Sequence, residues 1–178
     1  IVIDCSISCF NSLSIIHSIQ TLRILLSALA YDNLLCLDII VTTDKEPIVL
    51  CSEKSGNEIL SEKSQFWLTL FSVLKANKNS DLASGIRASL NIIKGRRANH
   101  TNYIFVLTDG LYCPSKRERI IGVVNNCFIK GINIFAIGIG ICPIGIQKIF
   151  PQCVYAQNPY KLIEGISIFL SDISKYKH

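Results

Sequence analysis

Four short segments of this chain are mostly apolar, and they constrain its fold more than any other feature. Strands buried on both faces have this continuous apolar character, whereas a strand with one solvent-facing side alternates. Longer segments with apolar residues at helical spacing lie between them, such as Ser12–Tyr31. The alternation predicts an α/β fold with a doubly wound, mostly parallel open sheet and helices on both faces. The four predicted strands are Ile1–Asp4, Leu35–Thr42, Tyr103–Leu107 and Ile132–Ile139.

The remaining segments fit around this sheet. Pro47–Cys51 follows a turn and is predicted to be an antiparallel edge strand, and Cys153–Ala156 a short final strand. Ser55–Ser64 is polar and is predicted to be irregular. Ser80 is a residue typical of a helix N-cap, and Gly131 is typical of a helix end. The further helices are expected over Gln65–Lys75, Ser80–Lys94, Ser115–Lys130 and Pro159–Tyr176.

The size and composition of the chain indicate one folded domain. It has 178 residues, of which 49% are hydrophobic and 17% charged, so it can bury a substantial core. It contains no methionine and begins inside a predicted strand, so we expect residues 1–178 to be a single domain from a larger protein. The longest apolar run, Ile132–Ile146, is interrupted by glycines and a proline, which excludes it as a membrane-inserted helix.

Charge and cysteine content bear on partners and location. The net charge is +5, but the basic clusters Lys94–Arg97 and Lys116–Arg119 contain no aromatic residues, so no nucleic-acid partner is expected. The eight cysteines form no CxxC pair, and several lie in apolar segments, which favours reduced thiols and an intracellular, cytoplasmic or nuclear, location. The sequon Asn99–Thr101 leaves an extracellular location open.

Oxygen-bearing side chains follow the predicted strands where these end. Asp4, Ser6 and Ser8 come directly after the first strand, Asp109 follows Tyr103–Leu107, and Ser80 opens a helix. Ligands of open α/β sheets bind outside the carboxyl ends of the strands, so these side chains are expected at one edge. Carboxylate and hydroxyl oxygens suit a hard divalent cation such as Mg²⁺. The pattern therefore predicts a metal site.

Three segments, in order, give a resemblance to a known family. DCSIS at Asp4–Ser8 fits the pattern DxSxS, NSDLASGI at Asn79–Ile86 is similar to a TDLxxAI segment, and FVLTDG at Phe105–Gly110 is similar to a second aspartate loop. With this order and spacing, nearly the whole chain resembles a von Willebrand factor type A (vWA) domain, also called an integrin I-like domain.

The resemblance implies a metal-ion-dependent adhesion site. Ser6, Ser8 and Ser80 would bind Mg²⁺ or Mn²⁺ through their hydroxyls, and Asp4 and Asp109 would hold waters on the ion. A partner protein would then supply an Asp or Glu carboxylate to the remaining position. Ser80 stands where the family mostly has threonine, which keeps the hydroxyl and loses the methyl that restricts its rotamer.

The function expected from these observations is a metal-dependent protein-interaction module without enzymatic activity. One alternative is a metal-free vWA scaffold in a larger assembly. Another is a Mg²⁺-dependent phosphohydrolase that uses Asp4 as its nucleophile. That chemistry usually has a second aspartate close behind the first, and here Ser6 takes that place.

Overall fold

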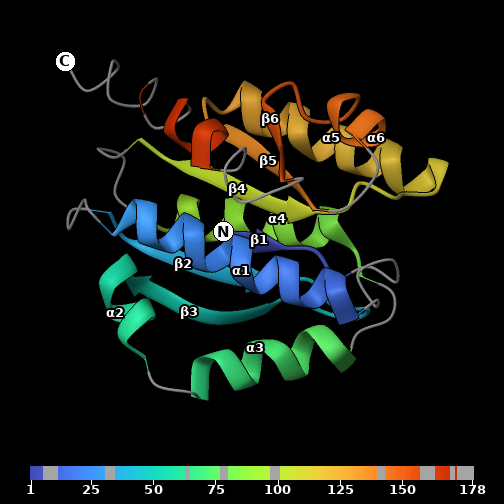
Figure 1. The fold of residues 1–178 in the computed structure, drawn as a ribbon. Coiled ribbons are helices and arrows are strands. Elements are labelled where there is room, and N and C mark those ends of the chain that lie inside the picture. The colour runs from blue at the N-terminus through green and yellow to red at the C-terminus, as the bar shows by residue number, and fades with distance from the viewer. Residues whose placement is uncertain are drawn as a thin grey trace.

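The computed structural model describes residues 1–5, 12–30, 35–62, 65–76, 80–96, 101–139, 143–156, 163–168 and 171. Its centre is a six-stranded sheet in the order β3-β2-β1-β4-β5-β6 (Figure 1). The strands are β1 (Val2–Ile3), β2 (Leu37–Val41), β3 (Ile48–Lys54), β4 (Tyr103–Thr108), β5 (Asn133–Ile139) and β6 (Cys153–Ala156). The helices are α1 (Ser12–Leu29), α2 (Gly56–Ser61), α3 (Gln65–Ala76), α4 (Leu82–Lys94), α5 (Pro114–Ile129) and α6 (Pro143–Gln147).

The pairing of the strands confirms the predicted sheet. β3 pairs antiparallel with β2 and forms one edge, while β1 pairs parallel with β2 and β4. β5 pairs parallel with both β4 and β6. The chain therefore has the mostly parallel, doubly wound sheet with one antiparallel edge strand that its sequence predicts.

Helices cover both faces of this sheet, and each face has its own core. Alternate residues of a strand point to opposite faces. In β4, Phe105 and Leu107 pack with α1, α2 and α3, whereas Ile104 and Val106 pack with α4, α5 and α6. Because both sets are buried, β4 reads in sequence as an uninterrupted apolar run.

Two short helices were not predicted. The prediction that Ser55–Ser64 is irregular is wrong, because α2 occupies Gly56–Ser61. The Ser55 side chain accepts from the Glu58 N–H, and the Glu58 side chain accepts from the Ser55 N–H, which is a capping box. α6 begins at Pro143, in a stretch rich in glycine and proline. Of the predicted final helix, positions 163–168 and 171 are helical, and 159–162, 169–170 and 172–176 lie outside the described residues.

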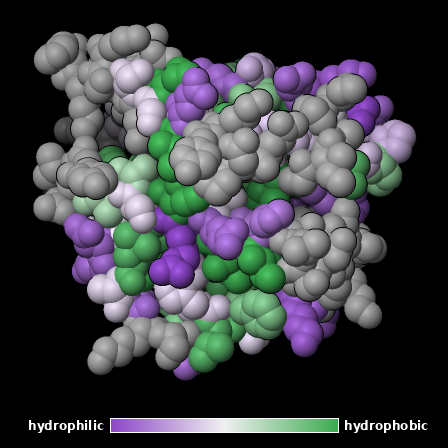
Figure 2. All heavy atoms as spheres, in the orientation of Figure 1, coloured by the Kyte–Doolittle hydropathy of each residue, from purple (hydrophilic) through white to green (hydrophobic). Residues whose placement is uncertain are grey.

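The surface combines hydrophobic and hydrophilic side chains. Figure 2 shows the two kinds interspersed on the face that carries α1 and α3. Leu68 and Phe71 of α3 are exposed apolar residues. Within the described ranges, no helix combines the length and the apolar character that a membrane span needs.

We expect at least six of the eight cysteines to react with a thiol reagent in the denatured, unreduced protein. Six of the described cysteines carry free thiols, and Cys9 and Cys142 lie outside the described residues. Titration in denaturant measures the number of thiols, with a fully reduced sample giving the total of eight. A count below six would contradict the prediction.

Candidate metal centre

Two of the predicted ligands lie where the strand order of the sheet reverses. The chain runs from β1 outward to β2 and β3, then returns to the other side of β1 with β4. Ile3 of β1 is paired with Leu107 of β4, and the Asp4 N–H donates to the Leu107 carbonyl at 2.8 Å. Asp4 and Asp109 therefore follow the carboxyl ends of two adjacent strands. This position is the usual ligand crevice of an open α/β sheet.

The Asp4 carboxylate is buried and held by hydroxyl groups. Its side chain is 2% exposed, and burying a carboxylate is costly unless hydrogen bonds compensate. Ser80 Oγ donates to Asp4 Oδ1 at 2.5 Å. Thr108 Oγ1 and the Tyr112 hydroxyl donate to Asp4 Oδ2 at 2.7 and 2.8 Å. Two of the three donors lie far from Asp4 in sequence on the β4–α5 segment, and the third lies just before α4.

The role of Ser80 differs from the predicted one. The N-cap of α4 is Asp81, which makes no side-chain capping bond, so the prediction that Ser80 caps this helix is wrong. The Ser80 hydroxyl is 3% exposed and donates to Asp4 instead. A hydroxyl that donates its only proton to a carboxylate directs its lone pairs elsewhere, where they can accept a cation.

Helix α5 holds the segment that carries Ser80. Lys116 Nζ donates to the Ser80 carbonyl at 3.0 Å, and Arg119 forms an ion pair with Asp81 at 2.6 Å. The Asp81 N–H also donates to the Thr43 carbonyl at 3.2 Å, which ties the segment to the end of β2. The position of the Ser80 hydroxyl is thus set by contacts on both sides.

Asp109 lies in a tight turn after β4. It is 7% exposed, and its Oδ1 accepts from the Leu111 N–H at 3.1 Å, as in an Asx-turn. Gly110 has a φ of +74°, a left-handed conformation that favours glycine, as the pair Asp109-Gly110 predicts. The Gly110 N–H donates to Thr108 Oγ1 at 3.1 Å, so the turn also orients the threonine that contacts Asp4.

Thr108 and Tyr112 are site residues that the sequence did not reveal. Burial, and then the charge of Asp4, raise the pKa of Tyr112 well above its usual value, so its phenol stays protonated at neutral pH. The Tyr112 and Thr108 hydroxyls also contact each other. Identifying Thr108 as a site residue requires the register of β1 and β4. Identifying Tyr112 requires the path of the turn after β4.

The structure brings some of the five predicted ligands together and leaves others untested. Asp4 and Ser80 are joined directly, and Asp109 lies at the neighbouring strand end. Ser6 and Ser8 lie outside the described residues. In the part of the chain that the structure describes, three or more His, Cys, Asp or Glu side chains nowhere gather as a metal cluster. The donor set is instead carboxylate and hydroxyl oxygens, which fit a hard cation such as Mg²⁺ or Mn²⁺.

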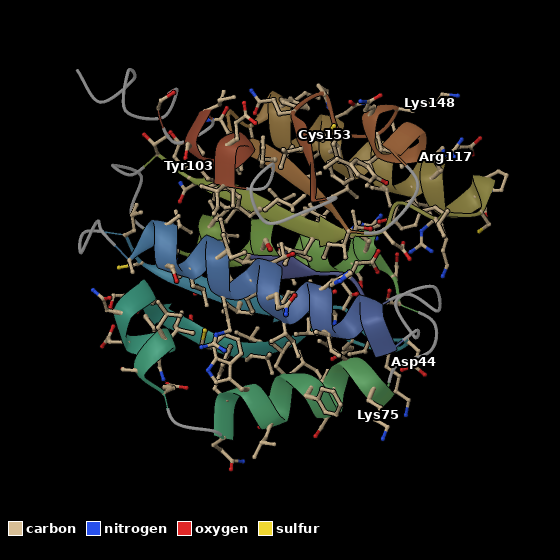
Figure 3. The ribbon with its side chains drawn as sticks, viewed as in Figure 1. Asp44, Lys75, Tyr103, Arg117, Lys148 and Cys153 are labelled. Carbon is tan, nitrogen blue, oxygen red and sulfur yellow. The ribbon has the colours of Figure 1, made fainter. Side chains whose placement is uncertain are left out.

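The site lies at one edge of the sheet. Figure 3 places Asp44, just after β2, and Arg117, near the start of α5, at the edge to which the parallel strands point. Tyr103, at the start of β4, lies at the opposite edge.

Several solved structures share this architecture. The VWA domain of SpRpn10 is 15% identical, with a TM-score of 0.69 over 94% of this chain and 92% of that one. The manganese-loaded TRAP protein of Plasmodium vivax is 19% identical, with a TM-score of 0.68 over 95% of this chain and 71% of that one. Mussel byssus proximal thread matrix protein 1 with a zinc-occupied MIDAS motif is 13% identical, with a TM-score of 0.60 over 95% of this chain and 44% of that one.

Sequence comparison gives no such match. No protein-family model matches the chain, and no curated protein matches it. The likeness in three dimensions extends over nearly the whole chain. The chain therefore has the von Willebrand factor type A fold, as its three sequence segments predict.

Proposed function

We propose that this domain is a protein-interaction module that binds its partner through a divalent cation at the edge carrying Asp4, Ser80 and Asp109. Mg²⁺ or Mn²⁺ would be held by the hydroxyls of Ser6, Ser8 and Ser80 and, through water, by Asp4 and Asp109. When bound, the ion supplies a positive centre that accepts an Asp or Glu carboxylate from the partner. Two structural neighbours, one manganese-loaded and one with a zinc-occupied MIDAS motif, support a divalent cation in a domain of this fold.

The contact between Ser80 and Asp4 carries this proposal. A hydroxyl that donates its hydrogen bond to a buried carboxylate keeps its lone pairs for a cation. Asp109, on the adjacent strand end, adds a second negative charge. Two carboxylates on an ion that carries two positive charges leave little net charge, but carboxylates that act through water leave the ion more electrophilic than direct ligands would.

The two alternatives are less well supported. A nucleophilic Asp4 needs an oxygen open to the substrate, whereas Asp4 is 2% exposed and both of its oxygens accept from hydroxyl groups. This arrangement supports a positioning role. A metal-free scaffold would keep the same fold, so an ion titration separates it from the interaction module. The free thiols of the described cysteines support an intracellular location.

We expect Mg²⁺ and Mn²⁺ to raise the melting temperature, because they bind the folded state and not the unfolded chain. At an ion concentration about 100 times Kd the gain is about 2.7 kcal/mol, or roughly 5–10 °C for a domain of this size. Calcium should have a smaller effect, because it prefers more carboxylate ligands. Asp109→Ala should remove the shift and keep the fold, since it deletes a charge near the ion and one turn hydrogen bond. Differential scanning fluorimetry measures all four cases.

The matched control is Asp44→Ala, which removes an exposed carboxylate at the same edge of the molecule. It should respond to the ions like the parent protein. If Asp109→Ala responds to Mg²⁺ as strongly as Asp44→Ala does, the ion binds elsewhere and the proposed site is wrong.

A further inference from the structure

The phenol of Tyr112 engages the same carboxylate oxygen as Thr108. The Tyr112 hydroxyl donates to Asp4 Oδ2 at 2.8 Å, and Thr108 Oγ1 donates to it at 2.7 Å. A carboxylate oxygen offers two lone pairs in its plane. Both hydroxyl groups of the β4–α5 segment therefore lie against Oδ2 and against each other, while Oδ1 faces Ser80.

We infer that Tyr112 is an internal competitor of the cation for Asp4, one that keeps this carboxylate an indirect ligand. The inference rests on the proposed function and adds a positioning residue to that site. A cation that approached Oδ2 would have to displace one of its two hydroxyl donors. Without an ion, the phenol offsets part of the buried negative charge, which an ion would otherwise do.

Of the two donors, Tyr112 is the one that can withdraw. Thr108 is the last residue of β4, is fully buried, and also accepts from the Gly110 N–H. Tyr112 lies between β4 and α5 and is half-buried. Its ring packs on the edge of the core formed with α4 and α5. The same turn carries Asp109. Moving the phenol away from Asp4 and bringing Asp109 to an ion would therefore involve one turn.

Tyr112→Phe tests this role, because it keeps the ring and removes only the hydroxyl. In EDTA the variant should melt at a lower temperature than the parent, since a buried carboxylate loses a donor. The melting temperature of the ion-bound state should fall less, because the ion compensates the charge of the Asp4 carboxylate. Titration calorimetry should therefore show Mg²⁺ and Mn²⁺ binding roughly tenfold more tightly, the size expected for one hydrogen bond to a charged group. A purely structural role would lower the melting temperature without tightening ion binding.

Two further variants make the result decisive. Tyr103→Phe removes a phenol hydroxyl at the opposite edge of the sheet and should bind the ions like the parent (Figure 3). Thr108→Val removes the other donor to Oδ2 and should also tighten ion binding. If the parent and Tyr103→Phe bind Mg²⁺ and neither Tyr112→Phe nor Thr108→Val binds it more tightly, the inference is overturned and the proposed function stands. If none of the proteins binds Mg²⁺ or Mn²⁺ at millimolar concentration, both are overturned.

Discussion

EDTA should release the protein partner of this domain almost completely, and Ser8→Ala should have the same effect in the presence of Mg²⁺. In the proposed site, both changes would remove the positive centre to which a partner carboxylate would bind. A charge-assisted contact to an ion in a site with little water contributes several kcal/mol, and each 1.4 kcal/mol is a factor of ten in Kd. The expected loss of affinity is therefore at least about a hundredfold.

The measurement is a quantitative pull-down from lysate with the parent domain and its variants, in Mg²⁺ and in EDTA. Ser27→Ala is the matched control, because Ser27 lies on the exposed side of α1 and its hydroxyl donates to the Arg23 carbonyl of the same helix. A specific partner should be retained by the parent and by Ser27→Ala in Mg²⁺ alone. A partner retained equally in EDTA would show that it docks elsewhere on the domain.

The partner itself provides a second check. Replacing each acidic residue of its contact segment by the corresponding amide should identify one position at which binding is lost, because one carboxylate completes the coordination of the ion. Amide substitution keeps the shape of the side chain and removes its charge. Small losses spread over many acidic positions would instead indicate a general electrostatic contact.

The sheet and the placement of the two aspartates could be predicted from the sequence. Strands buried on both faces read as apolar runs, and a polar residue directly after such a run marks its carboxyl end. Asp4 and Asp109 therefore had to lie at one edge once the sheet was parallel. The contacts of Asp4 depend on the strand register. Asp4 lies beside Thr108 because Ile3 is paired with Leu107. Spacing along the chain carries no information on that pairing.

The errors in the sequence analysis have equally local causes. Ser80 was assigned to a helix cap because its residue type favours that position, but the helix begins one residue later, with Asp81 at its N-cap, and the Ser80 hydroxyl donates to Asp4. α2 was missed because six residues are too few to show a helical period, although Ser55 and Glu58 have the spacing of a capping box. Tyr112 was missed because its direction depends on the left-handed turn at Gly110.

Gly110→Ala should be the most destabilising single-methyl substitution at the site. Gly110 has a φ of +74°, where a Cβ costs about 1–2 kcal/mol. The added Cβ would also lie 2.3 Å from Cγ1 of Ile146, which is fully buried in α6. Such an overlap in a packed core costs about 1–3 kcal/mol. The two costs together predict a loss of roughly 2–5 kcal/mol in the free energy of unfolding, measured by urea denaturation.

Two other glycines separate the two costs. Gly131 has a φ of +66° with nothing within 4 Å of an added Cβ, so Gly131→Ala should show the backbone cost alone, about 1–2 kcal/mol. Gly122 lies inside α5 with the same open space and no positive φ, so Gly122→Ala should stabilise the helix by about 0.5–1 kcal/mol. The expected order of destabilisation, from largest to smallest, is Gly110→Ala, Gly131→Ala and Gly122→Ala.

The overlap with Ile146 can be tested directly with a double-mutant cycle. Ile146→Ala alone should cost about 2–5 kcal/mol, because it leaves a cavity in the core. Combined with Gly110→Ala, it removes the atom that the new Cβ would meet, so the double variant should be less destabilised than the sum of the single variants. Gly110→Ala should also weaken ion binding, because the same turn positions Asp109, and ion binding should recover in the double variant. Additive losses would place the cost of Gly110→Ala in the backbone of the turn, and not in its packing against α6.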